Sequence, residues 1–216
     1  INNIAGKAFW AYKETEEVLI KKCSKELEEK FISNFKSIIN KDEFIDGISV
    51  DEKLNVRPYK NITYPVREIK QLINNYGQAY LLNNIGILNL DAFNQAVDQK
   101  QKEVTLPVAI NSPFSQGEKQ VYIMSLYISL LQISNNRVPF IIDTPFARID
   151  SEHRDKIVDV FFKKLGTQVF ILSTDEEIVG SSYMKLKDRI CNKLLLQSTK
   201  HGYTTISEDK YFGGCI

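Results

Sequence analysis

Two short apolar runs, each followed by polar residues, constrain the fold of this 216-residue sequence more than any other feature. The run Phe140–Ile142 ends at Asp143, and the run Val169–Leu172 shortly precedes Thr174. Continuous apolar runs are typical of parallel strands that are buried on both faces. The segment between them, 151–165, has apolar residues at helical spacing, so the sequence predicts a βαβ unit with a right-handed crossover. Asp143 and Thr174 are then expected at the carboxyl ends of neighbouring strands, where open α/β sheets bind ligands.

The segment before the first run has the pattern of a capped, buried helix. Ser115 and Glu118 form an S-x-x-E capping box, which predicts that a helix begins near Gln116. Between 121 and 133, apolar residues cover nearly every helical face, so we expect the helix to be buried; it is too short and too polar to cross a membrane. A capped helix start beside Gly117 is suited to an anion, although an isolated capping box would more simply only cap a helix. The strand, acidic turn and helix that follow favour the anion site.

The carboxylate at the end of the first strand admits two interpretations. If Asp143 is buried, it needs a cation, a hydroxyl or backbone donors. It would either hold Mg²⁺ through the water shell of the ion or cap the turn at Thr144-Pro145. We favour the magnesium interpretation.

In this order and spacing, the segments resemble the C-terminal half of an ABC-type ATPase head of the SMC-like branch. Residues 114–120 correspond to the signature motif, 138–145 to the Walker B strand, 147–150 to the D-loop and 168–174 to the switch strand. The family that the motifs resemble most is the SMC-like ATPase of the DNA phosphorothioation (Dnd) system. Related SMC-like anti-phage ATPases and the double-strand-break repair ATPase share these core motifs. The resemblance is dense over 114–178, thinner up to 212, faint over 18–56 and absent over 58–112.

This resemblance implies a fold class, cofactors, partners and a set of site residues. The fold would be the C-terminal α/β lobe of a P-loop NTPase head, with parallel core strands, flanking helices and a preceding coiled-coil base helix. The cofactors would be ATP and Mg²⁺, and two heads would close around ATP and act on DNA. The implied partners are the N-terminal half of the same head, a second head, DNA and other components of a DNA-modification or defence system. The implied nucleotide-binding residues are Ser115, Gln116, Gly117, Glu118 and Arg148; Asp143 is the metal residue, and the catalytic set is Asp143, Thr144, Thr174 and Asp150.

Two positions depart from the general ABC pattern. Thr144 replaces the usual glutamate after the Walker B aspartate, and Thr174 replaces the usual histidine of the switch. Neither hydroxyl is a general base at neutral pH, so hydrolysis would be slow or would use Asp150 or Asp175. Three hypotheses remain open: an ATPase in DNA phosphorothioation or phage defence, an SMC-like DNA repair ATPase, and an ATP-gated DNA-binding or scaffold module with little or no hydrolysis.

The sequence contains no phosphate-binding loop of the form G-x-x-x-x-G-K-[ST]. Its one Gly-Lys pair, Gly6-Lys7, is followed by Ala8, and Ile1 stands where the first glycine belongs. We therefore expect the chain to be a C-terminal portion that is inactive alone, while the N-terminal half of the head carries the phosphate loop.

Together with the remaining segments, the motifs predict that the chain has four parts. Residues 1–40 have an amphipathic helical pattern, which fits either the base of a coiled coil or an ordinary surface helix. Residues 41–113 are expected to be a small insertion, with one or two strands in 48–56 and mostly helix over 64–101. Residues 114–212 would form the ATPase lobe, with a helix over 176–190 and a hairpin of 193–198 with 203–207. Residues 213–216 would be a tail.

Composition excludes some classes of function. The net charge is only +1, so there is no global basic field that would indicate nucleic acid. The cysteines Cys23, Cys191 and Cys215 lack the spacing of metal ligands and suit free thiols in a reducing cytoplasm. His153 and His201 are expected to be surface residues. No signal peptide or membrane-spanning run is present, so a cytoplasmic protein with no membrane partner is expected.

Overall fold

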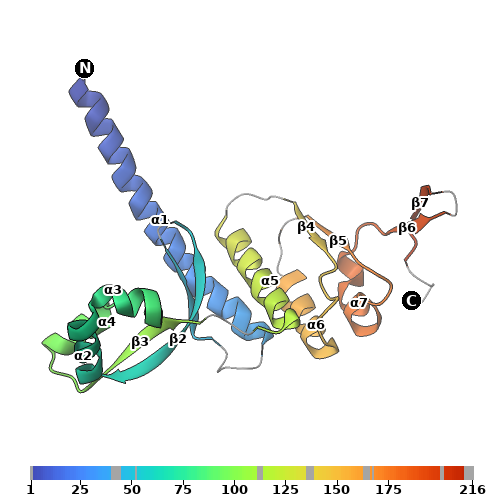
Figure 1. Cartoon of the computed structure of the whole chain (residues 1–216). Helices are drawn as coiled ribbons and strands as arrows, with labels where there is room; N and C mark the ends of the chain where they lie inside the picture. Colours follow the sequence, from blue (N-terminus) through green and yellow to red (C-terminus); the bar gives the residue numbers. More distant parts are fainter. Residues whose placement is uncertain are drawn as a thin grey trace.

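The computed structural model describes residues 2–39, 45–51, 53–110, 114–134, 139–162, 166, 168–199 and 202–211. Within these residues the chain is a mixed α/β structure with one long helix, several shorter helices and small sheets (Figure 1). The buried apolar side chains form two clusters. The first joins the long helix to the segments that hold the predicted site, and the second lies inside the 64–108 region.

The long helix α1 (Asn2–Ile38) projects from the body of the molecule along its N-terminal half (Figure 1). Trp10 and Val18 are exposed there, whereas the C-terminal half packs on α5 and β1. The residues that this half buries are Leu27, Phe31, Phe35 and Ile38. The predicted helix is thus confirmed. The predicted apolar stripe is buried only from Leu27 onward, because no described residue covers Ile20 and Cys23 completely. A coiled-coil partner for this helix stays a prediction.

An antiparallel sheet and a set of helices follow. Strands β1 (Gly47–Val50), β2 (Val56–Pro65) and β3 (Glu103–Ala109) pair in the order β1-β2-β3. Between β2 and β3 lie α2 (Val66–Tyr76), α3 (Gln78–Tyr80), η1 (Leu81–Ile85) and α4 (Asp91–Asp98). The prediction of one or two strands in 48–56 is confirmed by β1, whereas β2 begins only at Val56 and lies almost wholly beyond the predicted range.

The prediction for 64–101 was incomplete. Helices α2 and α4 are present, but Tyr64 belongs to β2. Tyr76, at the end of α2, is exposed and stacks on Tyr80. Strand β3 was missed altogether. Its alternation of buried Val104, Leu106 and Val108 is the sequence signal that would have revealed it. Ile48, which the sequence assigns to the insertion, packs in the first cluster; the boundaries of the four parts stay a prediction.

The parallel strand pair with an intervening helix is confirmed, and the right hand of the crossover stays a prediction. Strand β4 (Phe140–Asp143) and strand β5 (Val169–Leu172) pair in parallel, with Asp143 opposite Leu172. The crossover contains α6 (Ser151–Ile157), which continues into η2 (Val158–Phe162). Helix α5 (Gln116–Ile133) begins at the predicted residue and packs against α1. The parallel sheet has only these two strands within the described residues.

The expectation that β4, β5 and α5 are buried all round is wrong for this chain. One face of the two-stranded sheet is exposed, with Ile141 at 67%, Phe170 at 47% and Leu172 at 50% exposure. One face of α5 is exposed as well, and its residues are Ile123, Tyr127 and Leu130. The reason is geometric: α1 covers one side of α5, the crossover covers one side of the sheet, and no described residue covers the remaining faces.

The C-terminal region consists of α7 (Gly180–Leu186), η3 (Lys187–Arg189) and a hairpin of β6 (Leu194–Ser198) with β7 (Thr204–Glu208). The predicted hairpin is confirmed, although positions 200 and 201 of its turn, and with them His201, lie outside the described residues. The helix expected from Glu176 starts only at Gly180, after a turn at 175–177. Cys23 and Cys191 are free thiols, as expected, and Cys215 lies outside the described residues.

None of the helices in the described ranges is long and apolar enough to cross a membrane.

Substitution of two isoleucines on α5 tests which faces of this helix are covered. Ile128 is 1% exposed and Ile123 is 50% exposed. We expect Ile128→Ala to lower the free energy of unfolding by about 2–5 kcal/mol, because it leaves a cavity in the first cluster. The same substitution at Ile123 is expected to cost less than about 1 kcal/mol. Urea denaturation followed by circular dichroism measures both, and equal losses would show that the Ile123 face is covered.

Candidate functional site

The start of α5 has the predicted capping box. The Ser115 hydroxyl accepts a hydrogen bond from the backbone N–H of Glu118 at 3.3 Å, and the Glu118 carboxylate accepts one from the backbone N–H of Ser115 at 2.8 Å. Each of these two side chains therefore holds the backbone N–H of the other residue. The backbone N–H groups of Gln116 and Gly117 precede the first intrahelical hydrogen bond, so they are the donors that this helix start offers to an anion.

The start of α5 packs directly on the 144–150 loop. A Cβ atom on Gly117 would lie 2.6 Å from the carbonyl oxygen of Arg148, so only glycine allows this approach. The Arg148 guanidinium donates to the side-chain oxygen of Gln116 at 2.9 Å. The Gln120 amide donates to the carbonyl oxygens of Thr144 and Pro145 at 2.9 and 2.6 Å. The structure thus brings together the two segments in which the sequence placed most of the site residues.

Asp143 lies at the carboxyl end of β4, and its side chain is exposed. Within the described part of the chain its carboxylate accepts no hydrogen bond and has no ion-pair partner. The alternative in which Asp143 caps the Thr144-Pro145 turn is therefore not what the structure has. The carboxylate is free to bind a cation instead.

Thr144 follows with a φ of +44°, which is rare for a β-branched residue. Its backbone N–H donates to the carbonyl oxygen of Leu172 at 2.8 Å, which extends the pairing of β4 with β5 by one bond. Strain of this kind persists only where the surroundings fix the backbone. Here the backbone is fixed by the hydrogen bond to Leu172 and by the two hydrogen bonds that the Gln120 amide donates.

The carboxylate of Glu177 connects the ends of the two strands. Glu177 is 2% exposed, and its two oxygens accept the backbone N–H groups of Phe146 and Thr174, each at 3.0 Å. Phe146 belongs to the loop after β4, and Thr174 to the turn after β5. A single buried side chain therefore sets the spacing between the two loops that carry Asp143, Thr144 and Thr174. Sequence analysis assigned no role to Glu177, because nothing in its local pattern distinguishes it from the exposed acids beside it.

Arg154 makes a second connection between the same loops. Its guanidinium donates to the carbonyl oxygen of Ile149 at 2.7 Å and to that of Glu176 at 3.0 Å. The 144–150 loop is thus joined to the turn after β5 from two directions.

Asp150 acts as the N-cap of α6. One oxygen accepts the backbone N–H of His153 at 3.0 Å, and the other lies 2.6 Å from the Nδ1 atom of His153. The backbone N–H of His153, together with its side chain, holds the pKa of Asp150 below its ordinary value although partial burial opposes this. Both oxygens are engaged, which leaves Asp150 poorly placed to take a proton from water. Its catalytic role stays a prediction.

Thr174 and Asp175 lie at the exposed end of β5. The backbone of Thr174 is fixed by Glu177, and the side chains of both residues have no bonded partner within the described ranges. Of the two carboxylates proposed as substitutes for the missing glutamate, Asp175 is therefore the unengaged one.

The side chains available as metal ligands limit which ion the carboxyl edge of strands β4 and β5 can hold. Among the described residues there is no group of three or more His, Cys, Asp or Glu side chains that could hold a metal ion. A metal ion bound by Asp143 would thus have no cluster of further His, Cys, Asp or Glu ligands among these residues. Mg²⁺ fits such a position, because it keeps several water ligands and takes one or two carboxylates together with phosphate oxygens.

Comparison with known proteins gives little further guidance. No protein-family model matches the chain, and no curated protein matches it. One solved structure, from work on the ATP-driven dimerization and DNA-stimulated activation of SMC ATPases, superposes with a TM-score of 0.47 at 7% sequence identity. The superposition covers 90% of this chain and 89% of that one. A superposition this loose decides neither the fold nor the activity of this chain.

Glu177 and its exposed neighbour Glu176 provide a matched pair for testing the connection between the loops. In Glu177→Gln one backbone N–H must face the amide nitrogen, so one of the two hydrogen bonds is lost. We expect the free energy of unfolding to fall by about 1–3 kcal/mol, because a buried N–H is left unsatisfied. Amide hydrogen exchange should also accelerate at Phe146 or Thr174.

Glu176→Gln removes the same charge but no side-chain hydrogen bond, so it serves as the control. If both variants unfold at the same denaturant concentration and exchange alike, Glu177 does not hold the loops together.

Proposed function

We propose that this chain is the C-terminal half of an SMC-like ATPase head, which binds ATP and Mg²⁺ when it is joined to an N-terminal half that carries a phosphate loop. The observation that supports this most directly is the connected edge of the parallel sheet. Asp143 ends β4 and Thr174 follows the adjacent strand β5. Glu177 fixes the loops after both strands, and the start of α5 is packed on the first of these loops. Open α/β sheets bind ligands at this edge.

Each part of this edge has a role in the proposal. Asp143, which is exposed and unpaired, would hold Mg²⁺ through its waters. The N–H groups of Gln116 and Gly117, with the hydroxyl of Ser115, would meet the γ-phosphate held by the phosphate loop of a second head. Arg148, which lies beside them, would contact that second head. The Glu118 carboxylate would hold the start of α5 in its conformation through the hydrogen bond that it accepts from the backbone N–H of Ser115.

The uncovered apolar surfaces support the existence of a missing half. The sheet face of Ile141, Phe170 and Leu172 and the helix face of Ile123 and Leu130 stay largely exposed among the described residues. Parallel sheets are normally covered on both faces, and apolar patches of this kind mark interaction sites. The N-terminal half of the head is the partner that would extend the sheet and supply the phosphate loop.

The wider role follows from the motif resemblance alone. In this proposal two heads dimerise with ATP between them and act on DNA, in DNA phosphorothioation or in phage defence together with other components of that system. ATP binding closes the head pair and hydrolysis opens it.

A second candidate is an ATP-gated binding module with little or no hydrolysis. The observation that favours it concerns the groups that could activate the attacking water. Thr144 stands where a glutamate would activate water, and Asp150 is engaged by His153. Asp175 is then the one proposed substitute base that remains unengaged.

Steady-state phosphate release by the chain joined to its N-terminal half tests the first candidate against the second. We expect Asp143→Asn to lower kcat by at least about 100-fold, since the charge that holds the metal shell is lost. Thr144→Ala should have a modest effect, because the hydroxyl orients a water but does not take its proton. Thr144→Glu should raise kcat, since general-base help is worth about 10²- to 10⁴-fold.

The exposed Asp188, remote in sequence from the site, gives a control in Asp188→Asn, which should leave kcat unchanged. If Asp143→Asn behaves like this control, Asp143 is not part of the site. If the parent protein binds ATP but releases no phosphate, and Thr144→Glu restores release, the second candidate is correct.

A further inference from the structure

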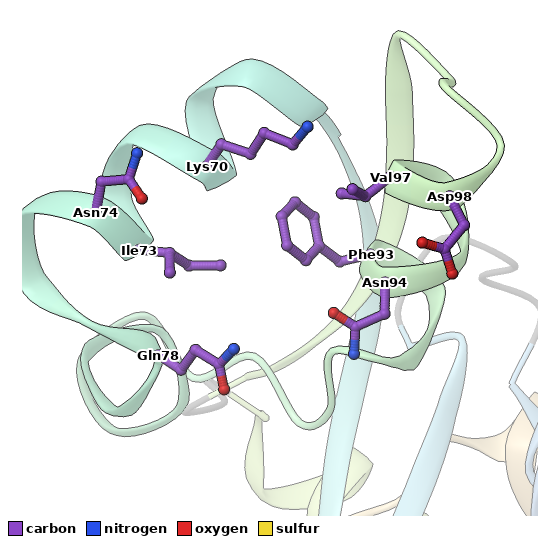
Figure 2. Close-up of a pocket in the computed structure, with 8 residues that line it drawn as sticks. All are labelled: Lys70, Ile73, Asn74, Gln78, Phe93, Asn94, Val97 and Asp98. Carbon is purple, nitrogen blue, oxygen red and sulfur yellow. The ribbon is translucent and has the colours of Figure 1, made fainter.

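An open groove lies between α2 and α4, in the region where the sequence resembles no known family. Its volume is about 540 Å³, within the range of sites that bind small molecules or single side chains. Figure 2 shows the Phe93 ring at the centre of the groove, with Ile73 pointing toward it from α2. Val97 completes the apolar floor. Phe93 is buried and belongs to the second cluster, so the floor is a fixed part of the fold.

Polar side chains surround this floor. Lys70 and Asn74 come from α2, Gln78 from α3, and Asn94 and Asp98 from α4 (Figure 2). All five are exposed, and none has a hydrogen-bond or ion-pair partner within the described ranges. These groups are therefore free to bind a ligand, and the chain does not use them to hold α2 against α4.

The chemistry of the rim narrows the ligand class. Three carboxamides, those of Asn74, Gln78 and Asn94, each offer a donor and an acceptor, which is the pattern that the peptide group itself presents. One lysine and one aspartate lie on different helices, so the rim has no excess positive charge for a phosphate. The described residues also form no acidic or histidine cluster for a metal. An apolar floor within a ring of carboxamides fits an apolar side chain and the peptide groups on either side of it.

We propose that this groove binds an extended segment of a partner protein. The segment places one apolar side chain, such as leucine, against the partly exposed Ile73 and Val97 beside the buried Phe93 ring, and its peptide groups bond to the carboxamides. An acidic neighbour lies near Lys70, and a basic neighbour lies near Asp98. This inference uses none of the residues of the proposed ATP site and holds independently of that function.

Blocked tripeptides test the proposal on the full 216-residue chain. The probes are acetyl-Glu-Leu-Lys-amide, the reversed acetyl-Lys-Leu-Glu-amide, and the same two peptides with glycine in place of leucine. Binding is followed by the side-chain amide resonances of asparagine and glutamine in ¹⁵N-labelled protein. We expect saturable shifts at Asn74, Gln78 and Asn94 with a leucine probe of one direction. Its glycine counterpart should bind at least ~10-fold more weakly, since the burial of a leucine is lost.

Variants of the rim identify the site. Lys70→Ala and Asn94→Ala should each weaken the leucine probe several-fold, while Asn84→Ala, an exposed asparagine of η1 outside the groove, should not. Thermal unfolding shows whether the variants retain the fold. We expect that they do, because all three substituted positions are exposed. Absence of saturable shifts, equal binding of leucine and glycine probes, or equal behaviour of Asn94→Ala and Asn84→Ala would each overturn the proposal.

Discussion

The buried carboxylate of Glu177 is the interaction on which the candidate site depends. Two backbone N–H groups from different loops bond to it, one after each strand of the parallel pair. Without it, the loop that follows Asp143 and the turn that holds Thr174 would be joined mainly by a four-residue strand pairing and by Arg154. The start of α5 is fixed to the same assembly because Gly117 lets it touch the backbone of Arg148. The geometry of the site is thus set by groups that themselves bind no ligand.

The surfaces that the chain leaves uncovered lie beside the same assembly. Strands β4 and β5 expose Ile141 and Phe170 on their free face, and α5 exposes Ile123. An exposed face of this composition on a parallel sheet is unusual for a protein that works alone. A partner that covers it would also lie next to the carboxyl edge of the strands. This is the physical reason for proposing that the site is half of a larger one, in which a partner would supply groups to the carboxylate of Asp143 and to the N–H donors of α5.

Sequence predicted the parts of this structure that depend on local patterns. The capping box of Ser115 and the βαβ unit follow from spacings of a few residues, and both are present. The exposure of Ile141 and the bonds of Glu177 were not predictable, because they depend on which segments meet in space. A continuous apolar run indicates a strand that is buried in its complete surroundings, and it does not say whether this chain supplies them. Strand β3 was missed for a different reason: its alternating pattern was present in 104–108 and was overlooked between helical segments.

The central claim is that the chain contributes one side of a nucleotide site and requires the other. Isothermal titration with Mg-ATP tests it most directly, first on the chain alone and then on the chain joined to its N-terminal half. The account predicts no measurable heat of binding for the chain alone, because its sequence contains no phosphate-binding loop of the form G-x-x-x-x-G-K-[ST]. It predicts saturable micromolar binding for the joined protein. Stoichiometric micromolar binding by the chain alone would contradict the half-site account.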